Sequence, residues 1–359
     1  SFEEYETTKF IANKLQENGY DLQAITATGG YIDIKGKNPS SKIIALRGDI
    51  DALPIIEQND VAYKSKNKGK MHACGHDVHI TSMVATARQL AALKDRWKGT
   101  VLFIVQPAEE RVGGAAAMLK DGLYTRFPKP DYALAFHVAA ELPTGKIAAS
   151  ETIQYSSADS VDIKVYGVGT HGAAPHLGRD PVYIASEIVV GLQSIISREK
   201  GPLEPGVITV GAFHSGTKHN IISEQANLQV TVRANSQETR DMLIDAIKRL
   251  AINTARAHGV AENRLPDVTV GESTPVTVND TALARRLNSK LADVLGPDVV
   301  VPFRQTNMGA EDFSYFVDPS YNIPGYYFAV GGSSPVWIEE ARKGGRPVAG
   351  HHSPLFRID

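Results

Sequence analysis

One segment of nine residues gathers side chains that can bind metal ions or move protons. Three histidines flank the only cysteine of the chain in Met71-His72-Ala73-Cys74-Gly75-His76-Asp77-Val78-His79. Cys74 and His76 lie two positions apart, so they cannot share a helix face. Gly75 between them suits a loop that turns both side chains toward one point. Any one of these residues alone would more often be structural, but the set together indicates a functional site.

Two adjacent acids, Glu109 and Glu110, form a second group with chemical potential. They follow an apolar run over 101–105 and the pair Gln106-Pro107. On a surface helix such a pair is ordinarily solvated charge. Behind a buried strand the two carboxylates would repel each other and raise one pKa, unless a cation separates them. A divalent metal meets that condition, because one glutamate can ligate it while the other acts as general base toward a metal-activated water.

Three short apolar strands are predicted to position these groups. They cover residues 43–46, 101–105 and 132–136, and polar side chains follow each one: Asp49 and Asp51, then Glu109 and Glu110, then His137. Predicted helices over 80–94 and 116–121 separate the strands. This alternation indicates an α/β domain with a mostly parallel sheet covered by helices on both faces. Such sheets bind ligands at the carboxyl ends of their strands, so the polar groups are expected to converge on one edge.

The pattern changes between residues 158 and 274. Predicted strands over 160–166, 207–213, 228–232 and 267–270 are interleaved with helices over 181–197 and 240–258. The order βαββαβ is that of the ferredoxin-like α+β module. We therefore predict a catalytic α/β domain made of residues 1–157 and 275–359, interrupted by an inserted ferredoxin-like domain over 158–274.

The length and composition of the chain indicate the number of domains and exclude some classes of binding partner. The chain has 359 residues, which at about 150 residues per domain favours roughly two domains. With 38 basic and 40 acidic residues and no basic block, nucleic acid and anionic membranes are excluded as main partners. No apolar run reaches the roughly 18 residues of a membrane span. The single cysteine excludes an internal disulfide framework and is compatible with a cytoplasmic location. Because the chain begins with Ser1, we expect it to be part of a longer protein.

Five motifs occur in an order typical of a known family. They are His72-Ala73-Cys74-Gly75-His76-Asp77, Gln106-Pro107-Ala108-Glu109-Glu110, Phe136-His137-Val138, Gly309-Ala310-Glu311-Asp312-Phe313 and His352-Ser353-Pro354. Through them the whole chain resembles the amidohydrolase branch of the aminoacylase/carboxypeptidase-type dinuclear metallopeptidases. That branch includes hippurate hydrolases, N-acetyl-amino-acid deacetylases and auxin-conjugate hydrolases. The resemblance implies hydrolysis of the amide bond of N-acyl amino acids, with dipeptide hydrolysis at the same site as the alternative.

The resemblance also implies which residues form the metal site. The ligands of two divalent ions (Zn, Mn, Co or Ni) would be Cys74, His76, Glu110, His137 and His352. Glu109 would be the general base, and Asp51 would orient a ligand. The neighbouring His351 could be mistaken for a ligand, but the motif places the ligand directly before Ser-Pro.

The inserted domain is expected to contribute to the same reaction. By resemblance, His171 would polarise the scissile carbonyl, while Asn220 and Arg233 would hold the substrate. Arginine suits this task because it binds a carboxylate bidentately. The resemblance further implies a homodimer formed through the inserted domain, with His171 reaching the site of the partner subunit. The expected partner is a small N-acyl amino acid or dipeptide.

Two other classes of function are weighed against this prediction. Cys74 could be the nucleophile of a cysteine hydrolase, but His76 lies too close in sequence to be a well-aligned base. That interpretation also leaves Glu109 and Glu110 without a role. Alternatively, the protein could be a non-catalytic metal-binding relative. The presence of both glutamates speaks against this, because an inactive relative need not retain the base.

Overall fold

The computed structural model describes residues 1–358, which form two compact units. Unit 1 comprises Ser1–Gln154, Thr277–Thr306 and the residues from Asp312 onward. Unit 2 comprises Tyr155–Val276 and Asn307–Glu311. No helix of the described chain is long and apolar enough to cross a membrane.

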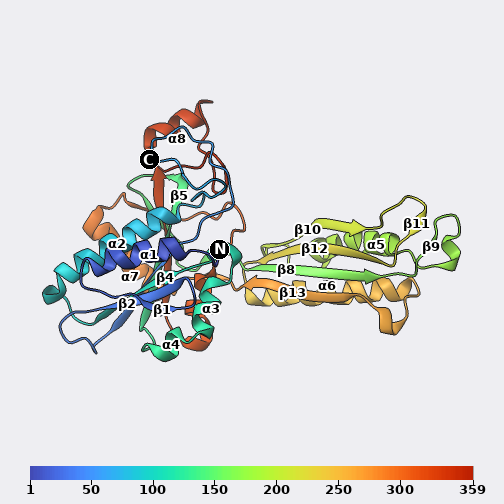
Figure 1. The fold of residues 1–359 in the computed structure, drawn as a ribbon, viewed down its shortest axis with the longest axis horizontal. Helices are drawn as coiled ribbons and strands as arrows, with labels where there is room; N and C mark the ends of the chain where they lie inside the picture. Colours follow the sequence, from blue (N-terminus) through green and yellow to red (C-terminus); the bar gives the residue numbers. More distant parts are fainter. Residues whose placement is uncertain (359) are drawn as a thin grey trace. The chain divides into compact units, whose positions relative to one another are not determined.

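Unit 1 is built on an eight-stranded sheet with the order β1-β2-β4-β3-β5-β16-β6-β15 (Figure 1). Its strands are β1 (Gln23–Ile25), β2 (Gly29–Lys35), β3 (Ile43–Asp49), β4 (Thr100–Gln106), β5 (Tyr132–Pro143), β6 (Ile147–Ala149), β15 (Val300–Pro302) and β16 (Gly325–Ser333). The four central strands β4, β3, β5 and β16 are parallel to one another. All seven residues of β4 are buried, as expected for a strand covered on both faces.

Helices cover both faces of this sheet. They are α1 (Tyr5–Gln16), α2 (His76–Ala92), α3 (Gly114–Lys120), α4 (Leu123–Arg126), α7 (Thr281–Leu295) and α8 (Pro335–Arg342). In Figure 1, α1 and α2 lie side by side, and their buried residues Ile11 and Met83 pack with Phe103 of β4. A second core joins Leu283 of α7 to Tyr326 of β16. The large, mostly parallel sheet between helices confirms the predicted α/β class.

The pairing of β3 and β5 ends early. Its last pair is Arg47 with Ala135, although β3 continues to Asp49 and β5 to Pro143. On its other edge β3 stays paired with β4 as far as Asp49 and Gln106. The chain passes from β3 to β4 on one side and then to β5 on the other, so the strand order reverses between β3 and β5. Ligands bind outside the carboxyl ends of strands at such a point.

Two local predictions for this region were wrong. The strand predicted over 132–136 runs on to Pro143, because β16 pairs with it through Val330 and Val138 and up to Ser333 and Pro143. The helix predicted from residue 80 already begins at His76. Gly75 precedes it with φ +83°, a left-handed conformation that glycine adopts without strain.

Unit 2 contains a four-stranded antiparallel sheet with the order β10-β12-β8-β13. Along the chain its main elements are β8 (Ala158–Tyr166), α5 (Pro181–Ser194), β10 (Gly206–Ser215), β12 (Gln225–Ala234), α6 (Gln237–Ala257) and β13 (Asp267–Thr274). A π-helical turn over Ile195–Glu199 extends α5. Two short strands of this unit, β9 (Thr170–His171) and β11 (Ile221–Ile222), pair with each other. A further pair, β7 (Ile153–Tyr155) and β14 (Thr277–Val278), belongs to unit 1 apart from Tyr155.

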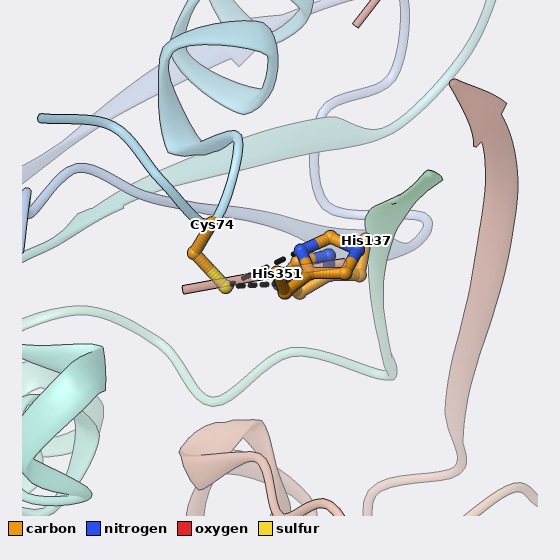
Figure 2. Close-up of side chains that lie close together, drawn as sticks. All are labelled: Cys74, His137 and His351. Carbon is orange, nitrogen blue, oxygen red and sulfur yellow. Dashed lines mark hydrogen bonds between the residues drawn. The ribbon is translucent and has the colours of Figure 1, made fainter. Parts of the chain in front are cut away.

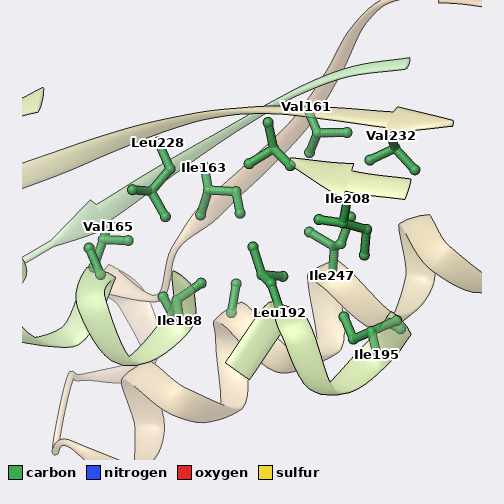
Figure 3. Packing of buried hydrophobic residues seen from close by; sticks show 14 of the residues in the cluster. Val161, Ile163, Val165, Ile188, Leu192, Ile195, Ile208, Leu228, Val232 and Ile247 are labelled. Atoms are coloured by element: carbon green, nitrogen blue, oxygen red, sulfur yellow. The ribbon is translucent and has the colours of Figure 1, made fainter. Parts of the chain in front are cut away.

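The core of unit 2 lies between its sheet and the helices α5 and α6 (Figure 3). Every second residue of β8 and β12 points into it, as Ile163 and Leu228 do, where they meet Leu192 of α5 and Ile247 of α6. This alternation makes one face of the sheet apolar and leaves the other polar.

Candidate metal centre

Residues from five separate segments of unit 1 meet at the carboxyl ends of β3, β4 and β5. Cys74 lies in the turn before α2, and His76 is the first residue of that helix. A Cβ atom at Gly75, between them, would lie 2.4 Å from Cγ1 of Val138. Only glycine therefore fits between the two predicted ligands, both for its backbone conformation and for its contact with β5.

His76 has one ring nitrogen satisfied and one without a partner. Its Nδ1 lies 2.9 Å from the carbonyl oxygen of Asp51 and 3.2 Å from Oδ1 of the same residue, so Nδ1 carries a proton. Nε2 is buried and has no hydrogen-bond partner among the described residues. It faces Oδ2 of Asp49 at 3.7 Å, and Oε2 of Glu109 and Oε1 of Glu110 at 3.9 Å each.

This arrangement fits a bound cation. A buried polar atom without a partner is destabilising, and so are several carboxylates gathered around it. Oε1 of Glu110 is a second buried atom without a hydrogen bond in the described chain. A divalent ion between these atoms would satisfy the imidazole nitrogen and the carboxylates together, so the residues present fit the metal that the sequence predicts.

The turn that carries Glu109 and Glu110 begins directly after β4. Ala108 adopts a left-handed conformation with φ +52°, and a short 3₁₀ helix spans Glu109–Arg111. The N–H of Glu110 donates to Oδ2 of Asp51 over 3.1 Å. Asp51 therefore contacts the backbone of Glu110 with one carboxylate oxygen and the ring of His76 with the other.

His137 and His351 both lie beside the thiol of Cys74 (Figure 2). Nε2 of His137 is 3.4 Å from Sγ, and its Nδ1 donates to the carbonyl oxygen of Val138 over 2.7 Å. Nδ1 of His351 is 3.7 Å from the same sulfur. The other nitrogen of His351 accepts the N–H of Ala140 over 3.4 Å, so one of its two ring nitrogens is already used.

His352 approaches the site from the C-terminal segment. Nε2 of its ring lies 3.3 Å from Oε2 of Glu110, and the backbone N–H of His352 donates to the carbonyl oxygen of Ala73 over 2.8 Å. Ligand atoms of Cys74, Glu110 and His352 all lie within 4.8 Å of one another, and the same holds for His76, Glu109 and Glu110. The two groups share Glu110, so its carboxylate lies between two places where an ion could bind. The thiol, imidazole and carboxylate donors suit borderline ions such as Zn²⁺.

The charges of the site shift the pKa values of its members. Burial raises the pKa of the Cys74 thiol well above its usual value, and Glu110 and Glu109 raise it further. Burial lowers the pKa of His76, but Asp49 and Asp51 outweigh it and raise that pKa to about 10. Burial, together with the neighbouring histidines, holds the pKa of His137 well below its usual value. Without metal, His76 is therefore a cation near neutral pH, while Cys74 is a neutral thiol.

The three predicted substrate-contacting residues belong to unit 2. His171 in β9 is exposed, and the N–H of Ala173 donates to its Nδ1 over 3.0 Å. Because Nδ1 accepts this hydrogen bond, the ring carries its proton on Nε2. Asn220 is close to it, since the N–H of Gly172 donates to the carbonyl oxygen of Asn220. Arg233 is half-buried near the far end of β12, and burial lowers its pKa.

The sequence interpretation missed a buried polar network behind the site. Arg47 donates to Oδ2 of Asp49 over 2.7 Å, to Gln106 over 2.7 Å and to Oδ1 of Asp312 over 3.0 Å. His79 contacts Oδ1 of Asp49 through Nδ1. One signal was available: Arg47 closes an apolar strand, and a buried charge of that kind requires partners.

The fold and this group of ligands define a metal-dependent hydrolase. Residues 45–340 match the model of peptidase family M20/M25/M40. The chain belongs to this family, which confirms the resemblance drawn from the five motifs.

Relatives and solved structures agree with this assignment. The chain is 36% identical over 320 residues to a hippurate hydrolase of Campylobacter jejuni, a match that covers 88% of this chain and 81% of that protein. It is 35% identical over 367 residues to thermostable carboxypeptidase 2 of Saccharolobus solfataricus, covering 100% and 87%. The crystal structure of the YXEP protein of Bacillus subtilis, described as a dinuclear metal-binding peptidase of the M20 family, aligns with a TM-score of 0.80 at 31% identity over 100% and 88% of the chains. The protein is therefore a metallo-amidohydrolase with a site for divalent metal ions.

Proposed function

We propose that the protein hydrolyses the amide bond of N-acyl amino acids, with two divalent ions held by Cys74, His76, Glu110, His137 and His352. The observation that carries this proposal is the buried Nε2 of His76, which has no hydrogen-bond partner within residues 1–358 and faces three carboxylates. The choice of His352 over His351 is supported by its 3.3 Å approach to Glu110. We propose Zn, Mn, Co or Ni as the metal ions and the cytoplasm as the location of the protein.

Bound divalent ions supply Lewis-acid chemistry that acidifies a water and polarises the amide carbonyl. Glu109, which lies next to the ligand Glu110, is positioned to accept the proton of the attacking water. It then returns the proton to the nitrogen of the leaving amine. Asp51 keeps the Nε2 atom of His76 aimed at the site because it accepts the Nδ1 proton. The Nε2–H of His171 donates a hydrogen bond to the oxyanion that forms on the carbonyl oxygen and keeps its proton.

We propose that unit 2 is a ferredoxin-like lid and dimerisation domain over residues 158–274, inserted between the catalytic segments 1–157 and 275–359. The distance between His171 and Arg233 within this unit supports an active site that two subunits share. His171 pairs with Ile221, which precedes Gln225, the first residue of β12. Arg233 lies eight residues after Gln225, near the other end of the same strand. At roughly 3.3 Å per residue these positions are on the order of 26 Å apart.

That separation exceeds the length of an N-acyl amino acid. One substrate therefore cannot contact His171 and Arg233 of the same chain. A homodimer removes the conflict if Arg233 binds the substrate carboxylate in its own subunit while His171 and Asn220 act in the site of the partner subunit.

The substrate class is tested with purified, metal-loaded enzyme. The panel contains N-benzoyl and N-acetyl amino acids, their amide analogues without the α-carboxylate, and dipeptides with a free amine. We expect the acyl amino acids to give the highest kcat/KM. Faster cleavage of the dipeptides would favour the alternative, a small-peptide hydrolase, for which the similarity to a carboxypeptidase is the supporting observation.

A further inference from the structure

A histidine side chain bridges β3 and β5 where their backbone pairing stops. Beyond the last pair, Arg47 with Ala135, Oδ1 of Asp49 lies 2.5 Å from Nδ1 of His79. The N–H of Val138 donates to Nε2 of the same ring over 2.9 Å. His79 is on α2, so this helix supplies the connection between the two strand ends that the backbone no longer makes.

These two contacts define the protonation of His79. A backbone N–H can only donate, so Nε2 of His79 is unprotonated. A ring without a proton on Nε2 holds its single proton on Nδ1 and is neutral. Nδ1 then donates to Asp49, and both ring nitrogens are occupied. His79 therefore does not bind a metal, although Asp49, His76 and His79 lie close enough together to do so.

Asp49 is itself fixed by a buried charge network. Its Oδ2 accepts a hydrogen bond from Nη1 of Arg47 over 2.7 Å, and Nη2 of Arg47 donates to Asp312 over 3.0 Å. Arg47, Asp49, Asp312 and His79 are all at most 5% exposed. Breaking a buried ion pair of this kind is strongly unfavourable, so the acceptor of the His79 proton is held in one place.

Val138, at the other end of the bridge, contacts His137 and also Gly75, the residue between the predicted ligands Cys74 and His76. Its carbonyl oxygen accepts the Nδ1 proton of His137, which leaves Nε2 of His137 facing Cys74. Its side chain lies against Gly75, where a Cβ atom would come within 2.4 Å. The position of Val138 therefore affects the ring of His137 and the turn that holds Cys74 and His76.

We propose that His79 is a positioning residue for the metal centre. As a neutral ring with its proton on Nδ1, it links Asp49 to Val138 and so aims His137 and Cys74 at a common ion. The inference rests on the proposed ligand set, and its test keeps the two separable. Outer partners of metal ligands typically change metal affinity about 10–100-fold when they are removed.

The first measurement uses the wild-type chain without metal. A long-range ¹H–¹⁵N correlation spectrum reports which nitrogen of each histidine carries the proton. We expect the proton of His79 on Nδ1 and none on Nε2, as its two hydrogen bonds require. A proton on Nε2, alone or together with one on Nδ1, overturns the proposal without the need for any variant.

The second measurement compares Zn²⁺ dissociation constants, obtained by chelator competition. His79→Phe keeps a ring of similar size but loses both hydrogen bonds, and we expect it to bind Zn²⁺ about 10–100-fold more weakly. His79→Gln can still offer an oxygen to the Val138 N–H and should recover part of the loss. Met83→Ala is the matched control, because Met83 is buried on α2 one turn after His79 and makes none of these hydrogen bonds.

The outcomes separate the two claims. Met83→Ala should lower the melting temperature and retain wild-type affinity for Zn²⁺. Equal affinity of wild type and His79→Phe overturns the positioning role of His79. A wild-type chain that binds no Zn²⁺ overturns the proposed function instead.

Discussion

The N–H of Glu110 and the ring of His76 share one acceptor, the carboxylate of Asp51. Glu110 donates to Oδ2 over 3.1 Å, and Nδ1 of His76 lies 3.2 Å from Oδ1. Two predicted ligands from different segments, the turn after β4 and the start of α2, are thereby held by the same side chain. Asp51 itself is 1% exposed and follows β3 by two residues.

We therefore expect Asp51→Ala to weaken metal binding about 10–100-fold, because Glu110 loses its acceptor and His76 keeps only the backbone carbonyl oxygen of residue 51. Asp51→Asn keeps the shape and one acceptor oxygen, so its affinity should lie between those of Asp51→Ala and wild type. Chelator competition measures both. If Asp51→Ala lowers kcat but binds metal like the wild type, Asp51 does not orient the ligands.

Substitution of Glu109 should affect turnover, whereas substitution of the adjacent Glu110 should affect metal content. Glu109→Gln should keep its metal and lose about 10²–10⁴-fold in kcat, the usual contribution of a general base. Glu110→Gln should lose metal, since Glu110 belongs to both groups of clustered ligand atoms. Metal content by elemental analysis and kcat are measured on the same samples. An empty site in Glu109→Gln with a loaded site in Glu110→Gln would reverse the two roles.

Metal uptake should release protons and weaken as the pH falls. The pKa of Cys74 lies well above its usual value and that of His76 is about 10, so both are protonated at pH 7.5 without metal. Metal ligands must be deprotonated, so loading displaces both protons. His137 releases none, because its pKa is held well below the usual value. Affinity should therefore fall at least about 100-fold for each unit of pH lost between 8 and 7, and His352, whose pKa Glu110 raises, steepens the fall.

Titration calorimetry in buffers with different enthalpies of ionisation counts the released protons. We expect at least two per chain, from Cys74 and His76, with a further contribution from His352, whose pKa is raised by its hydrogen bond to Glu110. His76→Ala should release one fewer, which serves as the control. Uptake of metal without proton release would contradict the assignment of Cys74 and His76 as ligands.

The shared site of the proposed dimer is tested by complementation. His171→Ala and Glu109→Ala should each be inactive, and His171→Ala should retain its metal. After co-refolding in equal amounts, half of the dimers are mixed and each has one complete site, so about a quarter of the wild-type activity should return. Two distinct affinity tags isolate the mixed dimer. If that purified dimer is inactive, His171 acts within its own subunit.

The sequence predicts which segments converge on one edge of the sheet, but it misplaces the ends of two elements around them. Asp49, Glu110 and His137 could be placed at one edge because each follows a short apolar strand, and parallel strands present their carboxyl ends together. The start of α2 at His76 was missed, because it depends on the left-handed conformation of Gly75 against Val138. The extension of β5 to Pro143 depends on pairing with β16, almost 200 residues later.

The bridge formed by His79 could not be predicted from sequence at all. His79 was one of three histidines around Cys74, and nothing in its spacing distinguishes it from the ligand His76. Its role follows from the end of the β3–β5 pairing at Arg47 and Ala135, which leaves the N–H of Val138 to a side chain. Such a contact depends on the separation of two strands, which local sequence does not encode.

The central claim is that clustered ligands in unit 1 hold two divalent ions that amide hydrolysis requires. The most direct measurement combines elemental analysis with turnover of N-benzoylglycine on the same sample, before and after exhaustive chelation and after metal is added back. We predict two ions per chain, no turnover once they are removed, and recovery with Zn²⁺, Mn²⁺, Co²⁺ or Ni²⁺. Full turnover by the protein without metal would contradict the account.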